Sequence, residues 1–188
     1  MPFDAAAGRQ RLIAIIKDRS FQTGPEMKLA SGRTSSFYFN MKPTMLHAEG
    51  ANLIANLILD QIADLKPSLV GGLEMGAVPI ASAVAAISQE RGTPVDAFFV
   101  RKQAKEHGTR SLVEGLPKGA TMDGRSLVIV EDVTTTGGSA LRAAVALRAE
   151  GATILRVVTI VDRQEGAADA FASAAINFQP ILTLQDFS

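Results

Sequence analysis

The sequence contains no cysteine and no tryptophan, and aromatic residues make up only 5% of its 188 residues. The lack of cysteine excludes disulfides, thiolate catalysis and cysteine-ligated zinc. With so few aromatic rings, Ala, Val, Ile and Leu must fill the core, which suits a parallel sheet covered by helices. Because hydrophobic residues account for 47% of the chain, we expect a single domain over residues 1–188 with a well-buried core.

Neither a surplus of charge nor a long apolar run is present. Lys and Arg total 19, as do Asp and Glu, so nothing favours a nucleic-acid partner, which usually requires a basic surplus. No stretch approaches the ~18 apolar residues of a membrane span. Residues 1–20 also lack the apolar centre of a signal peptide. We therefore expect a cytoplasmic protein with no membrane or nucleic-acid partner.

Apolar spacing and composition divide the chain into alternating helical and strand-like segments. Helices are predicted at residues 4–19, 49–65, 77–90, 139–150 and 166–174. Strands are predicted at residues 37–39, 69–73, 94–100, 126–130 and 153–161, with short ones near Ile176 and Ile181. Gly24-Pro25 is expected to break the chain. The order is typical of an α/β fold with a mostly parallel sheet flanked by helices, in which ligands bind at the carboxyl ends of the strands.

The run from Val128 to Ser139 carries the most informative pattern. An apolar strand is predicted to end at two adjacent carboxylates, and a Gly-Gly-Ser sequence opens the next helix. A helix N-terminus offers unpaired N–H groups and a partial positive charge, while glycines let the backbone approach a ligand closely. The residues predicted to form this binding loop are Glu131, Asp132, Val133, Thr134, Thr135, Thr136, Gly137, Gly138 and Ser139.

Carboxylates beside a phosphate site would repel the phosphate, unless the ligand also carries hydroxyl groups. Glu131 and Asp132 can accept hydrogen bonds from ribose hydroxyls, so the pattern indicates a phosphorylated ribose. The alternative is an ordinary strand-to-helix turn capped by serine. The Gly-x-Gly-x-x-Gly and Gly-x-x-x-x-Gly-Lys-[Ser/Thr] patterns are absent from this run, which argues against a dinucleotide site and a P-loop.

A cationic segment follows the strand predicted at residues 94–100. It contains Arg101, Lys102, Lys105 and His107. A diphosphate is a dense anion that needs several positive donors. The glycines that follow would let this polar loop close over a ligand and exclude water. The alternative is a solvated basic loop.

Together these patterns resemble the orotate phosphoribosyltransferases, which are type I phosphoribosyltransferases. Residues 128–139 look like the motif that binds 5-phosphoribosyl 1-diphosphate (PRPP), and residues 101–108 look like the catalytic loop of that family. Two further segments, residues 28–40 and 161–166, resemble those that hold the base. The resemblance covers nearly the whole chain. It implies the type I fold, with a small hood at about residues 20–45 and a mobile catalytic flap at about residues 102–123.

The resemblance also implies roles for individual side chains. Lys105 would neutralise the leaving diphosphate, with His107 assisting, and Asp132 is the third catalytic residue. Arg101 and Lys102 would bind the diphosphate of PRPP. The orotate contacts would be Tyr38, Phe39, Thr135 and Arg163. Arg163 suits the orotate carboxylate because guanidinium pairs with carboxylate through two hydrogen bonds; its alternative role is an ion pair at the rim. His47 matches no motif and is interpreted as a surface residue.

Two positions depart from the family pattern. Ala30 stands where many members have lysine, and Lys28 is expected to substitute because a two-residue shift along a strand keeps the same face. Glu74-Met75 stands where many members have Tyr-Lys, so any contact from this loop to diphosphate must come from its backbone. Related enzymes sometimes hold this loop in a cis peptide.

The implied reaction joins N1 of orotate to C1 of the PRPP ribose and releases diphosphate. Mg²⁺ is expected to arrive with PRPP rather than in a protein metal cluster. The resemblance further implies a homodimer in which the flap of one subunit reaches the site of the other. Two alternatives are a purine or uracil phosphoribosyltransferase and a regulator that senses PRPP. A regulator should lack the flap cations.

Overall fold

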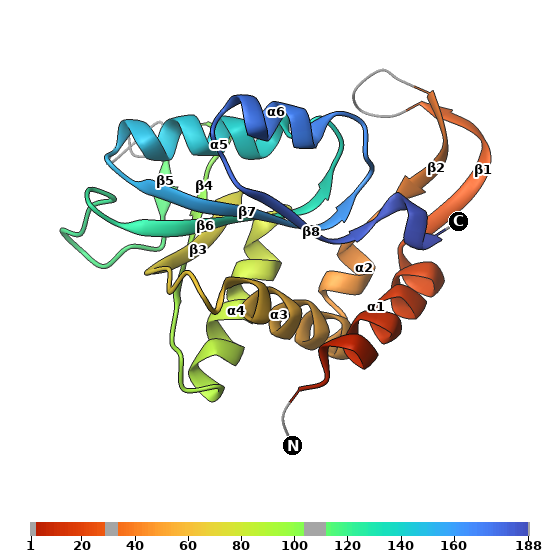
Figure 1. Cartoon of the computed structure of the whole chain (residues 1–188), viewed down its shortest axis with the longest axis horizontal. Helices are drawn as coiled ribbons and strands as arrows, with labels where there is room; N and C mark the ends of the chain where they lie inside the picture. Colours follow the sequence, from red (N-terminus) through yellow and green to blue (C-terminus); the bar gives the residue numbers. More distant parts are fainter. Residues whose placement is uncertain (1–2, 29–33, 104–111, 188) are drawn as a thin grey trace.

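The structure, a computed structural model, describes residues 3–28, 34–103 and 112–187. It consists of a six-stranded sheet with helices on both faces, and a separate two-stranded hairpin (Figure 1). The helices are α1 (Ala5–Arg19), α2 (Lys42–Met45), α3 (Ala48–Ile62), α4 (Ala77–Glu90), α5 (Gly138–Ala149), α6 (Ala167–Ser173) and the 3₁₀ helix η1 (Leu184–Phe187). The strands are β1 (Phe21–Lys28), β2 (Thr34–Phe39), β3 (Leu69–Leu73), β4 (Asp96–Val100), β5 (Val113–Glu114), β6 (Ser126–Thr134), β7 (Thr153–Asp162) and β8 (Phe178–Thr183).

The main sheet has the strand order β5-β4-β3-β6-β7-β8. All neighbouring strands are parallel except the short edge strand β5, which is antiparallel to β4. The carboxyl ends of β3, β4, β6 and β7 therefore meet at one edge of the sheet. This confirms the predicted α/β fold and brings the loops that follow these strands together.

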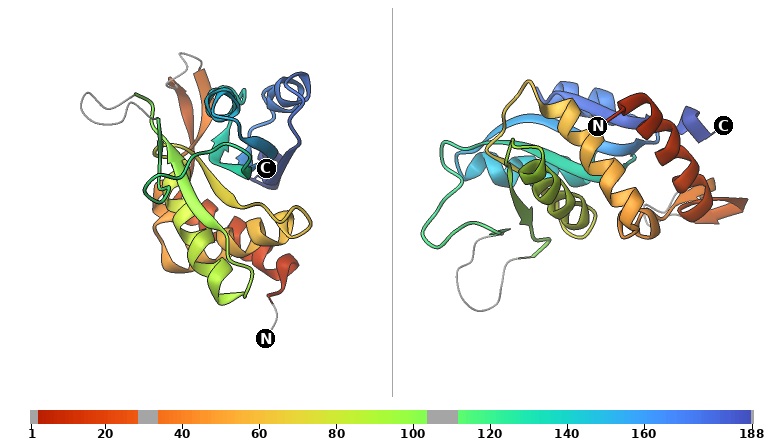
Figure 2. Two further views of the ribbon diagram at one scale, coloured as in Figure 1. Left: turned by 90° about the vertical axis from the view of Figure 1, so that its left-hand side faces the viewer. Right: turned by 90° about the horizontal axis from the view of Figure 1, so that it is seen from below.

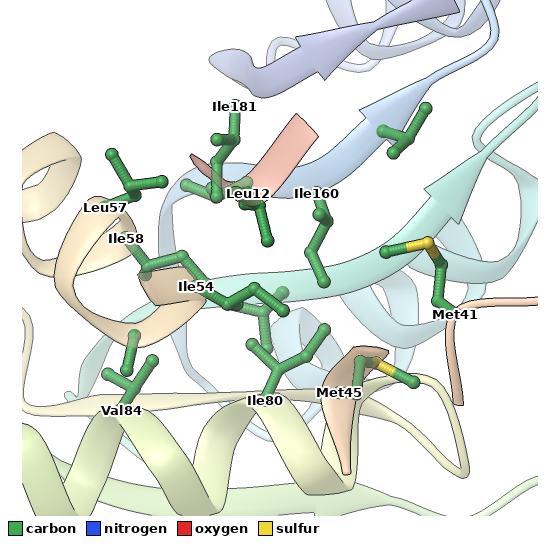
Figure 3. Close-up of a cluster of buried hydrophobic side chains, with 14 of the residues drawn as sticks. Leu12, Met41, Met45, Ile54, Leu57, Ile58, Ile80, Val84, Ile160 and Ile181 are labelled. Carbon is green, nitrogen blue, oxygen red and sulfur yellow. The ribbon is translucent and has the colours of Figure 1, made fainter. Parts of the chain in front are cut away.

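Two hydrophobic layers hold the helices against the sheet. One contains Ile54 of α3 and Ile80 of α4 with Ile160 of β7 (Figure 3). Helices α1, α3 and α4 lie side by side on this face, as the right-hand view of Figure 2 shows. The other layer contains Leu147 of α5 and Phe171 of α6. The sheet is thus buried on both faces, as its continuous apolar strands require.

Strand β6 at the centre of the sheet contributes to both layers in turn. Leu127 and Ile129 belong to the layer under α5 and α6, whereas Val128 and Val130 belong to the layer under α3 and α4. This is the alternation of side chains expected along a strand. The same alternation determines which face of the sheet each of the next two residues, Glu131 and Asp132, lies on.

The hairpin of β1 and β2 is antiparallel and lies at one end of the molecule (Figure 1). Its register shifts between Thr23 and Met27, so Gly24-Pro25 lies within β1 and does not break the chain as predicted. A bulge tolerates proline because the extra residue needs no ladder hydrogen bond. The Phe39 ring joins this hairpin to the C-terminal end, 4.9 Å from the Phe21 ring and 5.0 Å from the Phe187 ring.

Capping side chains begin two of the helices, and one of these caps was predicted. The Asp4 carboxylate accepts a hydrogen bond from the backbone N–H of Ala7 at 3.0 Å and begins α1. His47 has a role that the prediction missed, because its Nδ1 accepts from the backbone N–H of Gly50 at 3.4 Å and caps α3.

Other predicted boundaries were wrong. Strand β6 continues to Thr134 instead of ending at Val130, and β5 forms inside the predicted flap. Of the two short strands predicted near the C-terminus, the described residues contain one, β8, and Ile176 lies in the connection before it. No helix among the described residues has the length and apolar character needed to cross a membrane.

Candidate active site

The carboxyl-terminal half of β6 carries the two adjacent carboxylates. Its ladder with β7 continues past the apolar part of the strand, pairing Glu131 with Thr159 and Thr134 with Asp162. Glu131 lies on the α5 side, where the backbone N–H of Ala140 hydrogen-bonds to it. Asp132 lies on the other side, where a Cβ added to Gly76 would be 2.7 Å from its Oδ1. The two carboxylates therefore face opposite sides of the sheet.

Both carboxylates are partly buried, and this burial raises the pKa of each. The pKa of Glu131 rises to about 8, first through burial and then through the charge of Asp132, while Arg142 and Lys102 oppose the shift. Burial likewise raises the pKa of Asp132, against the backbone N–H of Val133 and the charge of Lys42. A pKa near neutrality at a cleft edge is typical of functional carboxylates.

A cavity of about 440 Å³ lies between the end of β6 and the start of α5. Gly137 is the N-cap of α5 at φ 79° and provides no side-chain cap. Ser139 is the second helical residue, so the alternative of a serine-capped turn is wrong. The N–H groups of Gly138 and Ser139 therefore remain for a ligand, whereas that of Ala140 hydrogen-bonds to Glu131. The residues lining the cavity are Glu131, Val133, Thr134, Thr135, Thr136, Gly137, Gly138, Ser139 and Arg142.

Thr134 supplies a second indication that this cavity receives a polar ligand. Its side chain is only 2% exposed, and its Oγ1 has no hydrogen-bond partner within the part of the chain that the structure describes. A buried hydroxyl without a partner destabilises a fold unless a ligand or water supplies one.

A second cavity, of about 350 Å³, shares Arg142 with the first and extends to the start of the predicted flap. Arg101 and Lys102 line it, as does Arg142 of α5. The backbone N–H of Lys102 donates to Oε1 of Glu74 at 3.0 Å, which links the flap to the loop after β3. In that loop the Glu74–Met75 peptide is cis, and the Met75 side chain is 60% exposed. Lys105 and His107 lie outside the described residues.

The predicted base site divides into exposed and buried parts. Tyr38 is 41% exposed, but the Phe39 ring is only 6% exposed and packs in the core. Adjacent strand residues face opposite ways, so Tyr38 has the exposed side chain of this pair. Contact of Phe39 with orotate stays a prediction. The side chain of Lys28 is not among those that the structure describes.

Arg163 is buried, at 6% exposure, and does not lie at an exposed rim. Its guanidinium is 4.6 Å from the centre of the Phe37 ring, and Nη2 lies 2.7 Å from Oε1 of Glu165. Its backbone N–H donates to the carbonyl of Thr134 at 2.9 Å. This bond ties the strand end that carries Arg163 to the cavity lined by Thr134 and Thr135.

Sequence reasoning missed three residues near the carboxylates. Arg142 follows Gly138 by four residues, and side chains on a helix point back toward its N-terminus, so helical spacing alone could have indicated it. Lys42 and Gly76 are distant from Asp132 in the chain. No local pattern could have placed them beside it.

Comparisons with known proteins agree with this geometry. Residues 43–181 match the phosphoribosyl transferase domain family. The orotate phosphoribosyltransferase of Bradyrhizobium diazoefficiens is 53% identical over 182 residues, covering 97% of each chain. A crystal structure of the Mycobacterium tuberculosis orotate phosphoribosyltransferase has a TM-score of 0.83 and 37% identity, covering 96% of this chain and 99% of that one. A crystal structure of the same M. tuberculosis protein in complex with PRPP has a TM-score of 0.77 and 35% identity, covering 95% of this chain and 98% of that one.

Proposed function

This chain belongs to the phosphoribosyl transferase family, among relatives that are orotate phosphoribosyltransferases, and we propose that it transfers the 5-phosphoribosyl group of PRPP to orotate. The products are orotidine 5′-monophosphate and diphosphate, so the reaction is a step of pyrimidine biosynthesis. The observation that carries the proposal is the cavity at the start of α5. Gly138 and Ser139, at the start of α5, line it with their backbone N–H groups available, and Glu131 lines it as well.

Each feature of the cavity matches a part of PRPP. The N–H groups of Gly138 and Ser139 suit the 5′-phosphate, and the Thr134 hydroxyl offers a further donor. Glu131 lines the cavity and accepts hydrogen bonds from the ribose hydroxyls. Asp132 meets the ribose from the other side of the strand end, near Gly76. In this arrangement the ribose lies across the end of β6.

Bond breaking at ribose C1 leads bond formation, so positive charge develops on the ribose and negative charge on the diphosphate. Ionised Glu131 and Asp132 stabilise the first charge. Arg101 and Lys102, at the end of β4, lie where they can bind the second, and Lys105 and His107 are assigned to the same group by their motif. Catalysis then consists of positioning and electrostatic stabilisation, and it requires no protein nucleophile.

Mg²⁺ is proposed to enter with PRPP. Among the described residues, no three acidic or histidine side chains gather closely enough to hold a metal ion. The protein would offer single carboxylates such as Glu131, while phosphate and water oxygens complete the ligand set that Mg²⁺ prefers. When bound, the ion supplies neutralisation of the diphosphate charge.

Orotate is proposed to bind between the hairpin and the end of β7. The Tyr38 side chain of the hairpin is exposed, and the backbone of Phe39 follows it. Thr135 lines the first cavity, at the start of α5. Arg163 is the partner for the orotate carboxylate, which competes with Glu165 for the guanidinium. A neutral base such as uracil or hypoxanthine offers no such group, so Arg163 favours orotate over these bases.

We further propose that two copies of the chain form a homodimer in which the flap of each copy completes the other's site. The support is the resemblance of residues 101–108 to a catalytic loop that acts across subunits. The cations of this loop also distinguish the chain from a regulator that only senses PRPP.

The test is a spectrophotometric assay of orotate consumption with PRPP and Mg²⁺. We expect turnover of orotate that depends on all three components. Turnover of uracil or hypoxanthine with none of orotate would overturn the substrate assignment. A protein that bound PRPP and turned over no base would favour the regulator.

A further inference from the structure

Arg142 is the described residue that lines both cavities of the site. It lies in the second turn of α5, and its side chain extends back over the first turn. Nη2 lies 3.4 Å from Oγ of Ser139, and a Cβ added to Gly138 would be 3.6 Å from Nη1. The guanidinium therefore lies next to Gly138 and Ser139, whose N–H groups remain for a ligand.

The Arg142 guanidinium makes few polar contacts with the described residues. Within the described residues no carboxylate forms an ion pair with it, and its hydrogen bond to Ser139 is long. The charge of Arg142 does favour the ionised form of Glu131, which is partly buried. An exposed guanidinium held over a cavity rather than over a carboxylate is available to an anionic ligand.

Among the described residues that line this cavity, no other side chain carries a formal positive charge. Apart from Arg142, its lining consists of one carboxylate, four hydroxyl-bearing residues, two glycines and one valine. Helix N–H groups supply only about half a unit charge. A phosphate carrying two negative charges beside Glu131 needs more compensation than that, and Arg142 is placed to provide it.

We propose that Arg142 binds the 5′-phosphate of PRPP and closes the phosphate site formed by the start of α5. This inference rests on the proposed transfer from PRPP and adds a binding residue to it. Arg142 acts in ground-state binding, so its loss raises KM for PRPP more than it lowers kcat. The rival assignment is the diphosphate, through the second cavity that Arg142 shares with Arg101 and Lys102.

Three ligands separate these assignments in a calorimetric titration: ribose 5-phosphate, inorganic diphosphate and PRPP with Mg²⁺. Arg142→Ala is expected to weaken ribose 5-phosphate and PRPP by the same factor, about tenfold to a hundredfold for a charge-assisted hydrogen bond. The affinity for diphosphate should not change. Arg142→Lys should recover part of the loss, because it keeps the charge without the two-pronged geometry.

Arg19→Ala is the matched control. Arg19 is also exposed and lies in α1, with Asp18 at 4.0 Å as its ion-pair partner. The Arg19→Ala variant loses the same formal charge as Arg142→Ala. Unchanged ligand affinities in it would show that a lower net positive charge alone does not weaken binding. Circular dichroism verifies the fold of each variant, and Arg142→Gln replaces the Ala variant if helical signal is lost.

Unchanged affinity of the Arg142 variants for ribose 5-phosphate would overturn the proposal, and a weakened diphosphate affinity would then assign Arg142 to the second cavity. Failure of the proposed function gives a different result. In that case the wild-type protein fails to consume orotate, whatever the Arg142 variants do to ribose 5-phosphate.

Discussion

Glu131 and Asp132 are adjacent in the sequence, yet their carboxylates lie on opposite faces of the central sheet. Glu131 faces α5 and hydrogen-bonds to the backbone N–H of Ala140, whereas Asp132 lies against Gly76 in the loop after β3. Because β6 continues through both residues, strand alternation separates them. The two acids are therefore not interchangeable, and their variants should differ.

Glu131 should make the protein less stable as pH rises. Its pKa in the folded protein is about 8, against an ordinary value of 4.5, so between these values the folded state holds a proton that the unfolded state has lost. Stability from this group is fully present below about pH 4.5 and is lost as pH rises through about 8. Glu131→Gln cannot titrate. We expect its melting temperature, relative to wild type, to rise between about pH 5 and pH 9.

The comparison with wild type cancels the other groups, whose titration both proteins share. Asp132 also has a raised pKa, so the melting temperature of the Glu131→Gln variant should itself still depend on pH. A difference between the two melting curves that stays constant with pH would contradict a raised pKa at Glu131. Activity should change with pH in the opposite direction to stability, because only ionised Glu131 accepts hydrogen bonds from both ribose hydroxyls. Wild-type kcat/KM for PRPP should therefore rise as pH approaches about 8.

Gly76→Ala should impair the reaction by displacing Asp132. Gly76 has φ −63° and ψ −38°, which alanine adopts without strain, so the added Cβ conflicts only with the nearby carboxylate at 2.7 Å. We expect kcat to fall by about tenfold or more with a small change in melting temperature. Asp132→Asn provides the comparison, since its amide oxygen can still accept from the backbone N–H of Val133.

If Gly76 acts through Asp132, the double variant should be no slower than Asp132→Asn alone. Steady-state kinetics of the two single variants and the double variant decide this. Additive losses would mean that Gly76 affects the reaction by another route, such as a direct approach of the backbone to diphosphate.

Gly137 and Gly138 should respond differently to alanine. Gly137 has φ 79°, and a Cβ there would be 3.0 Å from Cζ of Phe171, so Gly137→Ala should destabilise the fold by about 1–2 kcal/mol. The nearest atom to a Cβ on Gly138 is 3.6 Å away, an ordinary contact, so Gly138→Ala should retain stability. Urea denaturation measures both. Equal stability losses would show that the left-handed conformation of Gly137 is not what requires glycine.

Arg163→Lys should weaken orotate and leave PRPP binding intact. Lysine keeps the charge but loses the paired hydrogen bonds to a carboxylate, so we expect KM for orotate to rise about tenfold. Glu165→Gln is the matched variant, because it removes the anion that lies 2.7 Å from the guanidinium. KM for orotate should then stay the same or fall. A parallel loss of PRPP affinity in Arg163→Lys would indicate a structural role for Arg163.

Lys105→Ala should lose most turnover while PRPP still binds, because the assigned role is in the transition state. Lys118→Ala, in the same segment but outside the cationic motif, should retain activity. Mixing inactive Lys105→Ala and Asp132→Ala subunits tests the shared site. Half of randomly mixed dimers are hybrids with one intact site each, so about a quarter of the wild-type activity should return. No recovery, with subunit exchange verified by mass spectrometry, would place each flap in its own subunit's site.

Much of the fold could be predicted from local patterns. The helices from Ala5 to Arg19 and from Ala77 to Glu90 follow from apolar spacing and composition, and Gly151 at φ 86° ends α5 as its position suggests. The end of β6 could not be predicted, because its polar residues break the apolar pattern at Val130. Pairing with β7, on a distant segment, keeps those residues in the strand.

The sequence by itself determined the chemistry of the site: a strand, two acids, hydroxyls and glycines in the order that a phosphorylated ribose requires. Tertiary structure decided the directions and the neighbours. It placed Glu131 and Asp132 on opposite faces, buried the Phe39 ring, and brought Lys42 and Gly76 to Asp132. The physical reason is that residue order dictates local hydrogen bonding and helix direction. Burial and electrostatic partners depend on strands and helices far apart in the chain.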